Sequence, residues 1–208
     1  SVPLLTLRGT SAPVVSGDLV VTGFDGGRLT GVRLDDGALA WERRVATPRG
    51  RSELERMVDI DSRPVIVDDA VYVATFQGRI AALDLLSGRP LWDRDMSSHA
   101  GFQVAGGTLY VTDSDSHVWA LDRFNGNALW RQKKLKARRL TAPAVVGDWV
   151  AVADFEGYVH LLSRQDGSLA ARVQVGGGGV TAQPVARGGM LYVYDNSGRL
   201  SALRPAPD

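Results

Sequence analysis

The chain has 208 residues, of which 44% are hydrophobic and 23% charged, so it carries enough apolar side chains for a sizeable buried core. A formal net charge of +1 gives no electrostatic argument for nucleic-acid binding, and the lack of cysteine excludes disulfides, thiolate metal sites and cysteine nucleophiles. No apolar run long enough to cross a membrane and no signal peptide occurs in the sequence, so we expect any export signal or lipid anchor to lie outside these residues.

A sequence frame that recurs five times predicts the architecture. Its anchors are the turn residues Gly27, Gly78, Ser116, Gly157 and Gly198, which are separated by 51, 38, 41 and 41 residues. A short apolar strand begins seven residues before each anchor, and a second turn glycine follows ten residues after each of the first four. Repeats near 41 residues with four short strands each are typical of β-propeller blades, and no segment has a sustained helical period.

The predicted units, in chain order, occupy approximately 11–46, 62–97, 101–136, 141–176 and 182–205. They form an all-β fold of four-stranded antiparallel blades in a single β-propeller domain, or a fragment of one, over residues 1–208. The fifth unit is incomplete, because the frame stops after its third strand at Leu203. Two interpretations stay open: a fragment of a larger ring, or a complete five-bladed ring closed by residues 3–8.

Tryptophans recur fourteen residues after the anchor, at Trp41, Trp92 and Trp130, and Ala171 takes this place in the fourth unit. Their regular recurrence favours burial at equivalent places between blades over stacking on a ligand. Small residues also share one position of the frame, and we expect them to let adjacent blades approach closely. They are Gly31, Ala82, Ala120 and Ala202.

Residues with catalytic or metal-binding chemistry are sparse. His99, His117 and His160 do not have the spacing of a metal-binding pair, which favours structural roles. The stretch 113–116 looks like part of a calcium loop, but it aligns with the turns between second and third strands, so a turn explains it without an ion. No P-loop, G-x-S-x-G or H-E-x-x-H motif is present. The sequence therefore predicts neither a catalytic site nor a cofactor or metal site.

The stretch from Gly78 to Trp92 resembles the repeat of pyrroloquinoline-quinone-type propellers, a superfamily that contains both dehydrogenases and non-enzymatic scaffolds. More specifically, residues 5–9 before Pro13 and residues 59–61 before Pro64 resemble the BamB family, lipoproteins of the outer-membrane β-barrel assembly machinery. This resemblance extends over essentially the whole chain in order and spacing.

The resemblance implies the C-terminal portion of an eight-bladed propeller, without the N-terminal part that carries the lipid-bearing cysteine. It implies a non-enzymatic scaffold on the periplasmic face of the outer membrane, bound to the POTRA domains of BamA and, as a further option, to unfolded outer-membrane proteins. Two alternatives stay open. One is a fragment of a quinoprotein dehydrogenase, although the vicinal cysteine pair that often stacks on the quinone there has no counterpart here. The other is a generic interaction propeller.

The candidate partner-binding residues are Leu5, Leu7, Arg8, Asp59 and Asp61. Arg8 and Asp59 each lie five residues before the proline of a first strand, so they occupy equivalent positions on one rim. Asp61 is two residues further on, and this spacing in an extended segment returns its side chain to the same side. These charges fit either an internal salt bridge or a docking surface, and the two leucines fit either an interface centre or strand packing. The resemblance implies that residues of this motif contact BamA.

Two irregular segments complete the sequence pattern. The insertion 47–57 contains a capping box, Ser52 with Glu55, which predicts a short helix in either a binding surface or a tolerated loop. The run 131–139 carries six positive charges in nine residues. It fits a solvated strand and loop, or a contact with an acidic partner or with anionic lipid headgroups.

Overall fold

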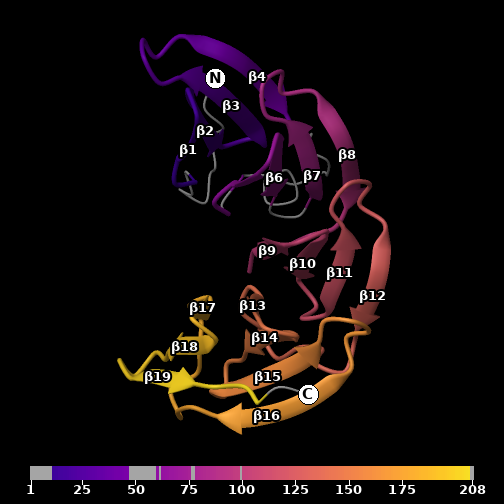
Figure 1. The fold of residues 1–208 in the computed structure, drawn as a ribbon, viewed down its shortest axis with the longest axis vertical. Helices are drawn as coiled ribbons and strands as arrows, with labels where there is room; N and C mark the ends of the chain where they lie inside the picture. Colours follow the sequence, from indigo (N-terminus) through magenta and orange to yellow (C-terminus); the bar gives the residue numbers. More distant parts are fainter. Residues whose placement is uncertain (1–10, 47–59, 61, 76–77, 99, 207–208) are drawn as a thin grey trace. The chain divides into compact units, whose positions relative to one another are not determined.

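The protein is all-β in the computed structural model, which describes residues 11–46, 60, 62–75, 78–98 and 100–206. Each strand pairs with the strand that precedes or follows it in the sequence, always antiparallel, as the blade prediction requires (Figure 1). Among the described residues, four sheets have four strands, in the orders β1-β2-β3-β4, β5-β6-β7-β8, β9-β10-β11-β12 and β13-β14-β15-β16, and one has three, β17-β18-β19. In the described part of the chain, no helix is long and apolar enough to span a membrane.

The chain divides into two compact units, described separately below. The first comprises Ser1–His99 and Phe124–Gly126, and the second comprises Ala100–Arg123 and Asn127–Asp208. The first unit contains β1 (Val14–Ser16), β2 (Leu19–Phe24), β3 (Arg28–Arg33), β4 (Leu39–Arg44), β5 (Val65–Val67), β6 (Ala70–Ala74), β7 (Arg79–Asp84) and β8 (Pro90–Asp95). The second contains β9 (Phe102–Ala105), β10 (Thr108–Thr112), β11 (Val118–Asp122), β12 (Ala128–Gln132), β13 (Ala144–Val146), β14 (Trp149–Ala153), β15 (Tyr158–Ser163), β16 (Leu169–Gln174), β17 (Val185–Arg187), β18 (Met190–Tyr194) and β19 (Leu200–Leu203).

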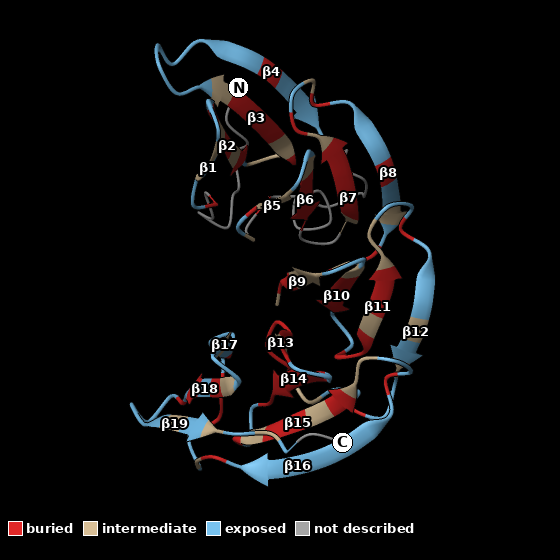
Figure 2. Cartoon of the chain, viewed as in Figure 1, coloured by how far each residue is buried: buried red, intermediate tan, exposed pale blue. Residues whose placement is uncertain are grey.

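Burial follows the position of a strand within its sheet. In the four-stranded sheets, second and third strands are the more buried ones, as β14 is along its whole length, whereas the fourth strand β16 is exposed along its whole length (Figure 2). In the three-stranded sheet the third strand, β19, has no buried residue. The third strand β7 has four consecutive buried residues. Strands with both faces covered do not need the polar alternation of a half-exposed sheet.

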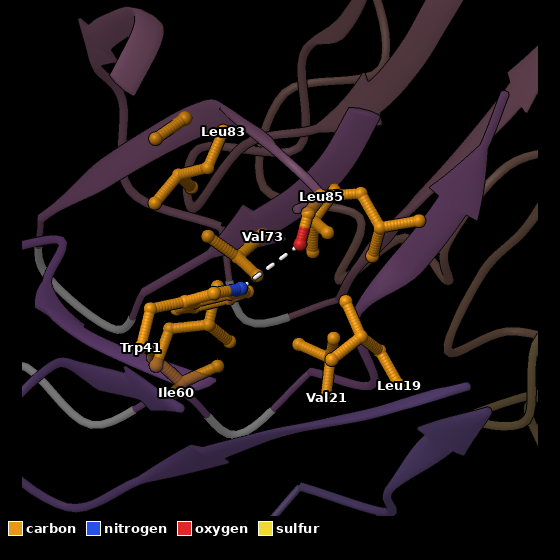
Figure 3. Close-up of a cluster of buried hydrophobic side chains, with 10 residues drawn as sticks. Leu19, Val21, Trp41, Ile60, Val73, Leu83 and Leu85 are labelled. Atoms are coloured by element: carbon orange, nitrogen blue, oxygen red, sulfur yellow. Dashed lines mark hydrogen bonds between the residues drawn. The ribbon is translucent and has the colours of Figure 1, made fainter. Parts of the chain in front are cut away.

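The tryptophan of β4 links two sheets of the first unit. The Trp41 side chain belongs to a core cluster with Leu19, Val21, Ile60 and other apolar residues of both sheets (Figure 3). Its ring nitrogen Nε1 donates a hydrogen bond of 2.9 Å to the carbonyl of Leu85. The polar end of the indole is therefore satisfied while its rings remain buried.

A glycine in the turn between the third and fourth strands receives each indole. A Cβ placed on Gly88 would lie 2.6 Å from the ring of Trp41, and one on Gly167 would lie 2.4 Å from the ring of Trp130. Trp92 meets Gly126 in the same way. Trp41 and Trp92 are buried, with 6% and 9% of their surface exposed, whereas Trp130 is only partly buried. The predicted packing between sheets is thus confirmed, with less burial at the third position.

Three of the four small residues of the frame lie opposite a tryptophan of their own sheet, a contact that was not predicted, whereas Ala202 lies opposite Tyr192. Gly31 pairs directly across the sheet with Trp41, and a Cβ on Gly31 would lie 2.5 Å from that ring. The same register places Ala82 opposite Trp92 and Ala120 opposite Trp130. In the fourth sheet both partners change, to Leu161 opposite Ala171. A small residue on the third strand therefore makes room for the indole on the fourth strand of the same sheet. Where the fourth-strand residue is small, the third-strand residue is large.

Some predictions concern residues outside the described part of the chain. These are the insertion 47–57 with its capping box at Ser52 and Glu55, the closing segment 3–8, and His99. The choice between a fragment and a five-bladed ring therefore stays a prediction.

Candidate partner-binding rim

The rim is the end of each sheet at which the loop into the first strand lies beside the turn between the second and third strands. All five predicted contact residues, Leu5, Leu7, Arg8, Asp59 and Asp61, lie outside the described residues. The described neighbours of these residues and their equivalents in other repeats show how the rim is built.

A recurrent hydroxyl group holds the incoming loop to the second strand. Ser11 Oγ accepts a hydrogen bond of 2.7 Å from the backbone N–H of Gly23, and Thr141 Oγ1 accepts one of 3.1 Å from Ala153. Ser62, at the same position of the frame, donates instead to the carbonyl of Ala74 at 3.1 Å. Ser11 and Thr141 are each only 4% exposed, so these bonds satisfy backbone groups that water does not reach. The backbone leading into these first strands is therefore tied to the sheet.

Ile60, between the two predicted aspartates, is an apolar anchor of the rim. It is fully buried in the core cluster with Trp41, and a Cβ on Gly23 would lie 2.4 Å from Ile60 Cγ2. The absence of a side chain at Gly23 thus leaves space for both the Ile60 side chain and the Ser11 hydroxyl. This close packing fixes the backbone at residue 60 beside the end of β2.

Arg138 shows what a cation at the position of Arg8 and Asp59 can do, since it lies five residues before Pro143. Its Nε donates to Asp154 Oδ2 at 2.6 Å, and its Nη2 donates to Glu156 Oε2. The Asp154 and Glu156 hydrogen bonds raise the pKa of Arg138 against the opposing effect of burial. Arg138 thus forms ion pairs within the chain, and its role is structural.

The two acceptors of that pair have no counterpart in the sequence of the first repeat. The positions of Asp154 and Glu156 correspond there to Phe24 and Gly26, neither of which can accept an ion pair from Arg8 through its side chain. An internal pairing of Arg8 would therefore require a different acceptor from the one that Arg138 uses.

Aspartates open the turns between second and third strands in the three sheets of the second unit. One carboxylate oxygen of Asp154 accepts hydrogen bonds of 3.0 Å from the backbone of Glu156 and of Tyr158. Asp113 and Asp195 make the equivalent pairs of bonds in their own turns. The stretch 113–116 is therefore a hydrogen-bonded turn, as predicted.

The charge state of Asp154 reflects two opposing influences. Burial of the carboxyl group is the largest influence and raises its pKa, but hydrogen bonds from His160, Tyr158 and Arg138 together hold the pKa below the ordinary value. The carboxylate is therefore charged at neutral pH. The pKa of Asp195 is lowered mainly by its hydrogen bond from Ser197.

Two histidines lie against these turn aspartates. His160 Nε2 is 2.8 Å from Asp154 Oδ2, and His117 Nδ1 is 2.9 Å from Asp113 Oδ2. Both rings are nearly fully buried. Burial lowers the pKa of His160 more than the Asp154 carboxylate raises it, so the ring is neutral at neutral pH and donates from Nε2. The predicted structural role is confirmed for both.

Two cavities are lined by few titratable side chains and fit binding better than acid–base catalysis. One, of 630 Å³, is lined by residues 174–177 and 199–203, with Arg199 as its charged side chain. Another, of 480 Å³, contains Asp148 and Arg164, and Arg164 is held by the Tyr110 hydroxyl and the Gly147 carbonyl. Among the described residues, no group of three His, Cys, Asp or Glu side chains is placed to hold a metal ion.

The sequence analysis did not predict the hydroxyl groups that hold the incoming loops or the aspartates of the turns. Both had a signal in the frame: Ser11, Ser62 and Thr141 each lie sixteen residues before an anchor, and the three aspartates each lie three residues before one. The pairing of Arg138 with Asp154 has no such signal, because the two residues come from different segments of one repeat.

Comparisons with known proteins agree with this architecture. The family model described as outer membrane protein assembly factor BamB matches residues 1–132 and 125–206. The outer membrane protein assembly factor BamB of Alkalilimnicola ehrlichii is 45% identical over 207 residues, which cover 100% of this chain and 54% of that protein. The crystal structure of BamB from Moraxella catarrhalis has a TM-score of 0.87 and 30% identity, over 97% of this chain and 60% of that chain.

More distant structures share the fold alone. The quinohemoprotein alcohol dehydrogenase from Comamonas testosteroni has a TM-score of 0.68 but 14% identity, over 97% of this chain and 44% of that chain. The chain spans about half the length of the curated relative it matches, 54% in the case of the Alkalilimnicola protein. Since the family model covers nearly all of its residues and the relatives match it from end to end, the chain belongs to the BamB family of outer membrane protein assembly factors.

Proposed function

We propose that this chain is part of a non-enzymatic scaffold subunit that assembles outer-membrane β-barrel proteins, and that it binds the POTRA domains of BamA through its rim. The observation that carries the proposal is the family match over nearly the whole chain, together with relatives named as assembly factors. The protein would act on the periplasmic face of the outer membrane, held by a lipid anchor in the full-length protein. Unfolded outer-membrane proteins are a second class of partner within the same proposal.

The contact residues in this proposal are Leu5, Leu7, Arg8, Asp59 and Asp61. Two features of the described structure support them. Ser11 and Ile60, the described residues nearest to them in the sequence, are held against rigid sheets, which favours a well-placed rim beside the proposed contact residues. The acceptors that pair with Arg138 are replaced by Phe24 and Gly26 in the first repeat, so that internal pair is not available to Arg8, and the proposal gives Arg8 an acceptor on the partner.

Binding of a BamA POTRA fragment from the same organism tests the proposal. Arg8→Ala and Asp59→Ala should each weaken binding by about 2 kcal/mol or more, because each leaves a desolvated charge on the partner unpaired. The proposal places both charged side chains at the surface, outside the core, so the free energy of unfolding should change by no more than roughly 1 kcal/mol.

Asp69→Ala is the matched control. Asp69 is an exposed aspartate in the turn between β5 and β6, at the other end of the same sheet, so its removal changes the net charge equally. Binding isotherms and thermal melts on the same preparations separate the roles. If Asp59→Ala and Asp69→Ala bind alike, or if the Arg8 and Asp59 variants lose stability and keep affinity, the rim assignment is wrong.

The quinoprotein alternative predicts a different result. A dehydrogenase fragment would change the absorbance of added pyrroloquinoline quinone in the presence of calcium, whereas a scaffold would not. The likeness to dehydrogenases at 14% identity gives that alternative no support beyond the fold.

A further inference from the structure

The loop Lys133–Arg139, which connects β12 to β13, concentrates positive charge on a fixed backbone and is called the basic loop here. It contains all three lysines of the chain, Lys133, Lys134 and Lys136, together with two arginines. The whole chain has a formal charge of only +1, so general basicity does not explain this concentration.

The backbone of the basic loop is held at several points. Leu135, only 4% exposed, packs into the core cluster of β10, β11 and β14. The N–H of Ala137 donates to the carbonyl of Asp115 at 3.0 Å, and the carbonyl of Arg138 accepts from Phe155 at 3.3 Å. Ala137 and Arg139 have φ values of 64° and 48°, a region that costs a residue with a side chain on the order of 1 kcal/mol. The surrounding contacts thus impose a strained conformation on a loop that could otherwise relax.

The charges of the loop fall into two groups. Arg138 is compensated by Asp154 and Glu156 in the neighbouring turn. Lys133, Lys134, Lys136 and Arg139 are exposed, and within the part of the chain that the structure describes none of the four forms an ion pair. Four like charges held close together repel one another, and a ligand with negative charge relieves that repulsion.

We propose that the basic loop is a docking surface for an acidic polypeptide segment. The carboxylates beside the loop favour a narrow partner over a membrane. Asp115, exposed in an adjacent turn, accepts a hydrogen bond from the loop through its backbone carbonyl, and Glu156, exposed in another turn, is bonded to Arg138. A broad anionic membrane would face these carboxylates as well, whereas a narrow acidic peptide can contact the lysines without lying over both carboxylates. This inference does not depend on the BamA proposal, which concerns loops in the other unit.

Fluorescence anisotropy with a labelled peptide of alternating Glu and Ser tests this docking surface. The variant Lys133→Gln/Lys134→Gln/Lys136→Gln should bind the peptide about tenfold or more weakly than the unmodified chain at about 50 mM salt, with a smaller difference at about 300 mM. The matched control is Arg44→Gln/Arg187→Gln/Arg204→Gln, which removes three positive charges from exposed positions elsewhere and should bind the peptide within about twofold of the unmodified chain. Thermal melts check that both triple variants remain folded.

Vesicles of phosphatidylglycerol, compared with vesicles of phosphatidylcholine, supply the second arm. The acidic-segment proposal predicts weak vesicle binding that does not depend on the three lysines. It is overturned if the peptide does not bind, if both triple variants weaken peptide binding equally, or if only the anionic vesicles bind in a lysine-dependent way.

Discussion

Two glycines of the first unit allow the energetic contribution of the packing between a tryptophan of one sheet and a turn glycine of the next to be measured separately. Gly37 and Gly88 occupy the same position of the repeat, in turns between third and fourth strands, with φ values of 70° and 64°. A Cβ on Gly37 would meet nothing within 4 Å, whereas one on Gly88 would lie 2.6 Å from the ring of Trp41. The two sites share the backbone cost of a side chain and differ in the indole contact.

The expected magnitudes follow from that difference. Alanine in the left-handed region costs about 1 kcal/mol at either site. At Gly88 the buried indole must also shift, which adds about 1–3 kcal/mol. For a chain of this size each kcal/mol lowers the melting temperature by about 2–4 °C, so Gly88→Ala should melt several degrees below Gly37→Ala.

A double-mutant cycle with Trp41 completes the test. Trp41→Ala alone should cost about 3–5 kcal/mol, but in its background Gly88→Ala should cost no more than Gly37→Ala. Thermal and urea unfolding of the single and double variants measure the coupling. Equal losses for the two glycine variants, or an unchanged cost of Gly88→Ala without the tryptophan, would refute the packing argument.

Two further predictions concern buried polar contacts. Ser11→Ala should destabilise the chain by about 1–3 kcal/mol, because the buried N–H of Gly23 loses its acceptor; a change below about 0.5 kcal/mol in urea unfolding would mean that water replaces the hydroxyl. His160→Gln should flatten the pH dependence of stability: the pKa of His160 is lowered from 6.5 in the folded state, so the unfolded chain takes up the proton first and the unmodified chain loses stability as the pH falls through 6.5. Melting temperatures of the unmodified chain and of His160→Gln that change equally with pH around 6.5 would contradict this prediction.

Sequence periodicity predicted the sheets well because each strand and turn leaves a local signal. The glycines that open tight turns and the apolar strands at fixed distances from the anchors located every sheet, and the recurrence of Trp41 and Trp92 predicted their burial. Frame position alone could not tell which neighbour a side chain meets. Gly31 was therefore assigned to contact between blades, whereas the structure places it against the indole of its own sheet.

The exchange at Leu161 and Ala171 shows how sequence could have given the right answer. Where the tryptophan is lost, the opposite residue grows from alanine or glycine to leucine, so the two positions vary as a pair within one repeat. Paired variation between strands of one sheet is evidence for a cross-strand contact. The candidate site showed no such paired change: its frame position holds Arg8, Asp59 and Arg138, and of these three repeats only that of Arg138 has an aspartate three residues before its anchor.

The charge of Arg8 offers a direct way to test whether the same frame position can serve either folding or binding. In the fourth repeat Asp154 captures Arg138 internally, and Phe24 stands at the position of Asp154 in the first repeat. Phe24→Asp should therefore supply Arg8 with an internal acceptor, compete with a POTRA fragment for its guanidinium and weaken binding by about 1–2 kcal/mol. Phe24→Asn is the uncharged control, and Phe24 is 36% exposed, so neither change should unfold the chain. If the two variants bind the POTRA fragment alike in isothermal titrations, an aspartate at position 24 does not pair with Arg8. Arg8 and Arg138 would then share a position in the sequence frame but not an ion-pairing role.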